Sequence, residues 1–295
     1  MAELVFIPGA SISSIAVENE RIVLAVAAPH HGGPKSERIF SGKTVRTSGA
    51  FHLVESDGLI AGVAVAPAHM TPREAAAFLY HDIFRNLGDR QLIRVWNYIP
   101  QINDLRDGEE NYREFNAGRL EAFRRNYGAE FRPRLPAASA LGTQTGGLAV
   151  AFLAGTETPV HFENPEQVPA CDYPPEYGAK PPAFARGTRV RIGDATHWFL
   201  AGTASIKGHL TLGQTCAEQL SLTLDNIRLM QRTMSLPPDA RSAWKVFVRR
   251  SADIEECREI FTAAYPGATE QTMFVQADIC RSELLVEIEA AFGKY

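Results

Sequence analysis

The last apolar segment of the chain carries two glutamates whose spacing suits acid–base chemistry. It reads "LLVEIEA" over residues 284–290, and strand periodicity places Glu287 and Glu289 on one face while the opposite face stays apolar. Burial disfavours the charged form of a carboxyl group, and a second carboxyl two residues away acts in the same direction, so both effects raise the pKa. The pair therefore indicates a general acid that stays protonated near neutral pH. The alternative is that both side chains face solvent on a half-exposed strand.

Arginines and a tyrosine elsewhere in the chain could bind an anionic ligand. The planar guanidinium group offers a carboxylate two parallel donors. We rank Arg134 first, because it lies in the otherwise apolar stretch "RPRLPAAS"; the other candidates are Arg119 in "NAGRLEAF" and Arg281 beside the glutamate strand. Tyr98, at the end of the apolar strand in "WNYIPQIN", could donate its phenol O–H to a ligand oxygen while its ring packs against the ligand. The alternatives are exposed arginines and a core tyrosine.

Small residues follow another predicted strand, at the point where it opens into the loop "AGTASIKGH". Small side chains let a ligand approach the backbone, whose amides can bind an anion. The residues in question are Gly202, Thr203, Ala204 and Ser205. His209 in the same loop could orient it or assist proton transfer, although a single histidine is more often structural. The alternative for the whole stretch is a tight turn with nothing bound.

Composition limits the classes of function. A chain of 295 residues, 45% hydrophobic and 22% charged, is long enough for two packed units. Its formal charge of -4 and pI near 6.1 lack the basic surface typical of nucleic-acid binding. The N-terminus has no basic region of the kind signal peptides carry, and the apolar run "IVLAVAAP" is too short to span a membrane. We therefore expect a soluble, cytoplasmic protein with no nucleic-acid or membrane partner.

The sequence offers no pattern for a metal or a nucleotide. The pair His30-His31 has no cysteine or carboxylate at ligand spacing, which favours a solvated loop. Neither a GxGxxG nor a P-loop pattern is present. The cysteines are scattered without CxxC spacing, as suits reduced thiols: Cys171, Cys216, Cys257 and Cys280. We expect no metal and no cofactor.

Two segments of the chain share one plan of elements. Each begins with an apolar strand containing Ala-Gly, followed by a loop, an amphipathic helix, a second strand, a second helix and a closing strand. The spacing from Gly62 to Asn86 equals the spacing from Gly202 to Asn226. Such an internal repeat, with strands outnumbering helices, predicts an α+β fold of two similar units.

The repeat sets the expected domain boundaries. We place the first unit at residues 48–155 and the second, which carries both glutamates, at 187–295. Residues 156–186 are rich in proline and acidic residues, and we interpret them as a connection across the surface, or a lid. Residues 1–47 are too short for a third unit and are predicted to complete the first one.

The second unit resembles the Rid/YjgF superfamily, which has a chorismate mutase-like fold. The stretches that carry the resemblance are "FLAGTASIKGHLTLGQTCAEQLSLTLDNIRLM" and "LLVEIEAAF". In the imine deaminases of that superfamily an arginine binds the substrate carboxylate. Its position would fall near Thr272, in "EQTMFVQAD", where this chain has no arginine. Deamination of an imine or enamine is therefore the weaker alternative.

A narrower resemblance covers nearly the whole chain. Five motifs in order resemble the chorismatase family of secondary metabolism: "VWNYIPQIN", "NAGRLEAF", "RPRLPAASALGT", "FLAGTASIKGH" and "QADICRSELLVEIEA". The resemblance implies tandem Rid-like units packed with pseudo-threefold symmetry, a monomer, chorismate as substrate and no cofactor. It also makes Glu287 the general acid; from their positions we expect Glu289 and His209 to support it. Ala204 and Cys280 stand where subtypes of the family differ.

Chorismate chemistry needs the residue types found here. The substrate is a dianion whose enol ether must be protonated on carbon before the C–O bond breaks, so a protonated carboxylic acid and arginines suit it. Capture of the resulting cation by the ring hydroxyl or by water gives pyruvate and a cyclic acid. We expect 3-hydroxybenzoate, with 4-hydroxybenzoate or a dihydroxycyclohexadiene carboxylate as alternatives. A protein that binds a small carboxylate without turnover is an alternative of another class.

Overall fold

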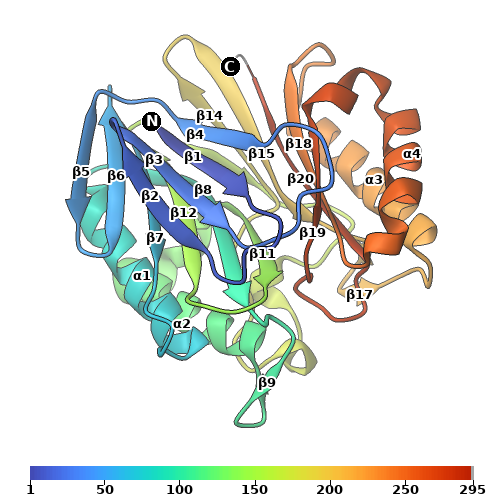
Figure 1. Cartoon of the computed structure of the whole chain (residues 1–295), viewed down its shortest axis with the longest axis horizontal. Coiled ribbons are helices and arrows are strands. Elements are labelled where there is room, and N and C mark those ends of the chain that lie inside the picture. The colour runs from blue at the N-terminus through green and yellow to red at the C-terminus, as the bar shows by residue number, and fades with distance from the viewer. Residues whose placement is uncertain (294–295) are drawn as a thin grey trace.

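The computed structural model describes residues 1–293, and its first 40 residues form a sheet of their own (Figure 1). The strand order is β2-β3-β1-β4, in which β1 and β3 are parallel and the other neighbours antiparallel. The strands are β1 (Ala2–Phe6), β2 (Ser14–Glu18), β3 (Arg21–Val26) and β4 (Ser36–Phe40). This corrects the expectation that residues 1–47 complete the first unit, because β1 pairs on both sides within this segment. Only the strand at residues 44–48 joins the next sheet.

The first unit is a six-stranded sheet with order β11-β8-β12-β7-β6-β5. Its helices are α1 (Pro72–Leu87) and α2 (Asn111–Tyr127), and α1 begins at a capping box in which Thr71 and Glu74 bond each other's backbone N–H. A small hairpin, β9 (Leu105–Arg106) and β10 (Glu109–Glu110), precedes α2, and a 3-10 turn, Gly128–Arg134, follows it. The strands are β5 (Thr44–Ser48), β6 (Phe51–Ser56), β7 (Leu59–Val65), β8 (Gln91–Pro100), β11 (Ala137–Thr143) and β12 (Ala149–Gly155).

The second unit repeats this topology with order β19-β18-β20-β15-β14-β13. In both sheets the first two strands of the order are parallel and all other neighbours antiparallel. The strands are β13 (Val160–Phe162), β14 (Gly187–Ile192), β15 (Ala195–Thr203), β18 (Ser242–Val248), β19 (Thr272–Gln276) and β20 (Val286–Phe292). The other elements are α3 (Cys216–Thr233), α4 (Ile254–Ala264), the hairpin β16 (Ile206–Lys207) with β17 (Leu210–Thr211), and 3-10 turns at Ala170–Asp172, Pro175–Tyr177, Ser251–Asp253 and Pro266–Gln271. The predicted α+β duplication is confirmed, whereas pseudo-threefold symmetry stays a prediction.

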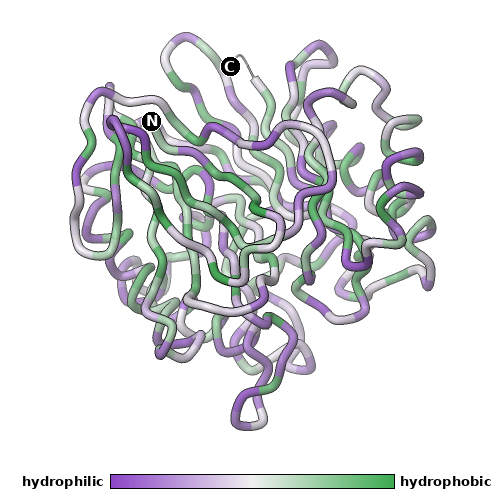
Figure 2. The backbone as a smooth tube through the Cα atoms, in the orientation of Figure 1, coloured by the Kyte–Doolittle hydropathy of each residue, from purple (hydrophilic) through white to green (hydrophobic). Residues whose placement is uncertain are grey.

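The three sheets share one apolar core, and the helices cover the outer faces of the two larger sheets (Figure 1). Buried side chains of all three sheets contact one another there, among them Leu4, Trp96 and Phe247. Figure 2 shows hydrophobic residues along the central strands and many hydrophilic residues in the outer loops. In the described chain, none of the helices has the length and apolar character that crossing a membrane requires.

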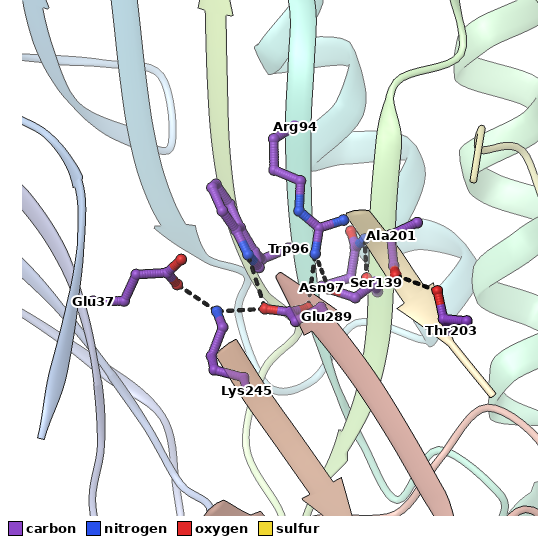
Figure 3. A network of polar contacts seen from close by, with 9 residues as sticks. All are labelled: Glu37, Arg94, Trp96, Asn97, Ser139, Ala201, Thr203, Lys245 and Glu289. Carbon is purple, nitrogen blue, oxygen red and sulfur yellow. Dashed lines mark hydrogen bonds and ion pairs between the residues drawn. The ribbon is translucent and has the colours of Figure 1, made fainter. Parts of the chain in front are cut away.

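Buried ion pairs cross between the sheets (Figure 3). Arg94 on β8 donates to Glu289 Oε2 on β20 at 2.7 Å and to Ser139 Oγ on β11 at 3.0 Å. The Lys245 ammonium on β18 forms ion pairs with Glu289 and with Glu37 on β4. Each of the three sheets therefore contributes a charge to one network, which is buried except at the partly buried Glu37.

Removing one member of this network should destabilise the protein far more than removing an exposed ion pair. We expect Arg94→Met to lower the free energy of unfolding by about 3–5 kcal/mol, because it leaves a buried carboxylate with one cation fewer. Arg46→Met is the control: Arg46 pairs with Glu55 but its side chain is 40% exposed, against 2% for Arg94, and its loss should amount to about 1 kcal/mol or less. Urea denaturation measures both. Equal losses would contradict a structural role of the network.

Candidate active site

A cavity of about 220 Å³ lies where the first unit meets the second. The edge strand β11 contributes Ser139, while β15 and β20 contribute Gly202 and Glu287. The proline-rich connection closes one side with Tyr173 and Tyr177. The cavity is thus built from segments that are far apart in the sequence.

Glu287 is the buried acid of this cavity. Its side chain is 3% exposed, and its Oε1 has no hydrogen-bond partner within residues 1–293. Burial and then the charge of Glu289 raise the pKa of Glu287 to about 8, against the opposing effect of Arg94 and Arg186. A Cβ atom at Gly202 would collide with Glu287 Oε1, so the glycine gives the carboxyl group its space. The Glu287 carboxyl is therefore protonated at neutral pH.

Three buried arginines line the same cavity: Arg119, Arg186 and Arg281. In the described part of the chain, each keeps one guanidinium nitrogen without a hydrogen-bond partner: Arg119 Nε, Arg186 Nε and Arg281 Nη2. A buried donor without a partner is unfavourable unless a ligand or a water molecule accepts its hydrogen bond. The three side chains therefore suit a ligand with more than one anionic group.

Short contacts fix the orientation of these arginines. Arg119 Nη2 donates to Asn116 Oδ1 at 2.8 Å, and both residues lie on α2. Arg186 Nη2 donates to the Tyr173 hydroxyl at 2.6 Å. The Arg281 guanidinium lies 3.9 Å from the ring centroid of Tyr177, within cation–π range. Two of the three arginines are thus oriented by tyrosines of the connection, which the sequence had suggested as a surface connection or a lid.

Neutral groups complete the lining. Burial and then the Glu287 charge raise the pKa of Cys280 to about 12, so its side chain is a thiol and not a thiolate. Burial likewise raises the pKa of Tyr112. Ala204 and Phe184 supply apolar surface. A ring could therefore pack in the cavity while the arginines bind its anionic groups.

The structure places Tyr98, Arg134 and Thr203 outside the cavity lining, which corrects three sequence predictions. Tyr98 packs edge-to-face in the shared core with its ring centroid 5.9 Å from that of Phe6, because β8 is covered on both faces. Arg134 is exposed and donates to Gln91 Oε1, since it ends a 3-10 turn at the surface. Thr203 Oγ1 donates to the carbonyl of Ala201 (Figure 3).

The remaining predicted residues border the cavity without lining it. The Ser205 hydroxyl is buried between lining residues and has no partner in the described structure. The His209 carbonyl accepts a hydrogen bond from Arg281 Nη1 at 2.8 Å, and its ring contacts Tyr177. Glu289 lies in the buried network behind Glu287. His209 and Glu289 thus hold lining residues or influence them.

Sequence reasoning missed Arg186 and the two tyrosines of the connection. Arg186 directly precedes β14, in "AFARG", and a buried arginine between apolar residues and a glycine was the available signal. Tyr173 and Tyr177 stand in a segment with little periodicity, so their inward orientation follows only from the packing of the connection onto the cavity.

Comparisons with known proteins show which family this chain is similar to. Residues 40–154 match the family model "Chorismatase FkbO/Hyg5-like, N-terminal". A 3-hydroxybenzoate synthase from Streptomyces hygroscopicus is 38% identical over 231 residues, which cover 73% of this chain and 67% of that protein. A chorismatase from Streptomyces rapamycinicus is 35% identical over 246 residues, covering 77% and 72% respectively.

A solved structure extends the comparison to the full length. A crystal structure of a chorismatase matches 99% of this chain and 92% of its own with a TM-score of 0.84 at 27% identity. Identity above 30% along most of the chain, together with this likeness of fold, leads to one conclusion: the chain belongs to the chorismatase family.

Proposed function

We propose that this protein cleaves chorismate into pyruvate and 3-hydroxybenzoate. Support comes from its family, from the similar protein named 3-hydroxybenzoate synthase, and from the chemistry of the cavity. The observation that carries the proposal is the buried, protonated carboxyl of Glu287 beside three arginines with unpartnered donors. Chorismate presents the matching features, two carboxylates and an enol ether that an acid can protonate.

Glu287 would act as the general acid. It gives its proton to the methylene carbon of the enolpyruvyl group, which creates an oxocarbenium-like centre and leaves Glu287 as a carboxylate. The neighbouring ring hydroxyl attacks this centre and forms a new C–O bond, while the original bond between the other ring oxygen and this carbon breaks. The attacking oxygen then leaves the ring carbon and becomes the carbonyl oxygen of pyruvate, and the ring, which keeps the original oxygen, becomes aromatic. The ring loses a proton, and a proton returns to Glu287. Chorismate supplies all atoms of both products, so this route consumes no water.

The arginines would bind the two carboxylates of chorismate. Arg281 and Arg186 are pre-oriented by the tyrosines of the connection, and Arg119 by Asn116. Pre-orientation reduces the entropy lost when the substrate binds. Their charges also favour the carboxylate form that Glu287 acquires after donating its proton. Substrate binding and the proton transfer would therefore use the same cations.

Cys280 and Ala204 would influence the choice of product. Both line the cavity, and their size decides how much room water has near the cationic centre. The partly buried Cys280 thiol favours capture by the ring hydroxyl, which gives 3-hydroxybenzoate. The small Ala204 leaves room for water and hydrolysis to a dihydroxycyclohexadiene carboxylate. We favour the first route; a monomeric, cytoplasmic enzyme remains part of the proposal.

The direct test supplies chorismate to the purified protein and follows pyruvate, with the ring product separated by chromatography. We expect pyruvate and 3-hydroxybenzoate from the wild type. Glu287→Gln should reduce kcat by about a hundredfold or more, because it removes the proton donor and preserves the shape. Absence of pyruvate from the wild type would refute the proposal. Binding of chorismate without turnover, unchanged in the mutant, would favour a carboxylate-binding protein instead.

The pH dependence of kcat/KM should report the acid. Glu287 must be protonated to act and its pKa is about 8. Activity should therefore be retained below this pH and fall tenfold per unit as the pH rises above it. Steady-state rates between about pH 4.5 and pH 10 cover both this limb and the range near pH 5. A decline that begins near pH 5 would show that Glu287 is ionised in the free enzyme and would contradict its role.

Arg186→Gln should weaken substrate binding. Loss of a buried charged donor to a carboxylate corresponds to about 1.5–3 kcal/mol, or roughly 10–100-fold in kcat/KM. Arg191→Gln is the matched control, because Arg191 is exposed on the adjoining strand β14. Initial rates over a range of chorismate concentrations give both values. An equal effect of the two substitutions would show that Arg186 does not bind the substrate.

A further inference from the structure

The buried network behind Glu287 contains as many positive as negative groups (Figure 3). Glu289 accepts from Arg94 Nη2 at 2.7 Å and from Trp96 Nε1 at 3.1 Å. Lys245, 5% exposed in its side chain, forms ion pairs with Glu289 and Glu37. Two cations therefore face two carboxylates, and the four charges cancel.

Glu287 is the next carboxyl group on the same face of β20 as Glu289. If it ionises, Glu287 and these four groups together carry one net negative charge, which a low-dielectric interior disfavours. Arg186 in the cavity acts in the opposite direction. If Glu37 is neutral, the other three groups carry a net positive charge that favours ionised Glu287. On this charge balance, a negative Glu37 opposes the ionisation of an acid that belongs to another sheet.

We propose that Glu37 is a positioning residue for Glu287: through Lys245 and Glu289 it completes a neutral cluster and so keeps the Glu287 carboxyl protonated. Its catalytic consequence rests on the proposed function. The inference assigns a role to the N-terminal sheet, whose strand β4 carries Glu37. That sheet would supply a charge to the acid without contacting the substrate.

The position of Glu37 supports an effect through charge alone. Glu37 and Lys245 line a separate hollow of about 670 Å³ between the sheets, and neither lines the cavity with Glu287. The charge of Glu37 nevertheless acts on the interior, because the pKa of the buried Tyr98 is raised first by burial and then by Glu289 and Glu37. Glu37→Gln can therefore change the electrostatics of Glu287 while leaving the substrate cavity intact.

Other titratable and charged groups also face this region, and the experiment must hold them constant. Lys245 and Tyr98 face Glu37. Those that face Glu287 come from β8, α2, the connection, the loop before β20 and β20 itself: Arg94, Tyr112, Arg119, Arg186, Cys280, Arg281 and Glu289. All of them are retained in the variants below.

The experiment follows the protonation of Glu287 itself. Infrared difference spectra of wild type against Glu287→Gln, recorded over a range of pH, isolate the carbonyl band of the protonated carboxyl. The same difference is measured in the Glu37→Gln background, which keeps an oxygen that accepts from Lys245. Removing one negative charge from the network should lower the midpoint. Two unit charges roughly 10 Å apart in a medium with an effective dielectric constant of about 20 correspond to about one pH unit, so we expect a shift of that order.

Two controls separate charge from packing. Glu3→Gln removes a carboxylate of the same sheet that is more deeply buried than the partly buried Glu37, but Glu3 pairs with Arg21 and not with Lys245, so the midpoint should move much less. Glu37→Asp keeps the charge and should leave the midpoint close to that of the wild type, even if the fold is somewhat less stable. The alkaline limb of kcat/KM should shift in parallel with the infrared midpoint.

The outcomes distinguish this inference from the proposed function. An unchanged or higher midpoint in Glu37→Gln, or an equal shift in Glu3→Gln, would overturn the role of Glu37 even if chorismate is cleaved. A lower midpoint in Glu37→Gln alone would support that role even if no pyruvate forms, in which case only the proposed function fails.

Discussion

The rest of the structure depends on the ion pairs formed by the buried carboxylate of Glu289. Arg94 and Lys245 hold it from two sheets, and Glu37 from the third balances the second cation. Although burial opposes its ionisation, Lys245 and Arg94 lower the pKa of Glu289. Buried ion pairs contribute little net stability but tolerate few alternative arrangements. The network therefore favours one arrangement of the three sheets.

The same carboxylate gives its neighbour a different protonation state. Glu287 lies in the same strand, yet among residues 1–293 no cation lies within ion-pair distance of it. Burial, and then the ionised Glu289, raise its pKa. The folded protein therefore keeps Glu287 protonated at pH values above 4.5, where the same group in the unfolded chain, with its ordinary pKa of 4.5, has lost its proton. Stability accordingly falls as the pH rises from about 4.5 towards 8, by roughly 3 kcal/mol at pH 7. Keeping Glu287 protonated at neutral pH therefore lowers the free energy of unfolding.

The duplication explains where the site lies. Both units have the same sheet topology, but the glutamates occur only in the closing strand of the second, and the first supplies Ser139 and Arg119 from β11 and α2. The connection between the units adds Arg186 and the tyrosines. Each unit alone would hold an incomplete set of groups, so the cavity depends on the packing of both units and on the segment that joins them.

The sequence alone determined the features that follow from local pattern. Strand alternation identified Glu287 and Glu289, the equal spacing of Gly62–Asn86 and Gly202–Asn226 identified the duplication, and Arg119, Ala204, Cys280 and Arg281 were found among its motifs. Only the tertiary structure decided which polar groups converge. In the structure, Arg186 lines the cavity whereas Arg134 lies at the surface. Tyr98 lies in the core, and Glu37 pairs with Lys245. The physical reason is that periodicity fixes the face of an element on which a side chain lies, whereas the partner of a buried charge depends on which elements pack against that face.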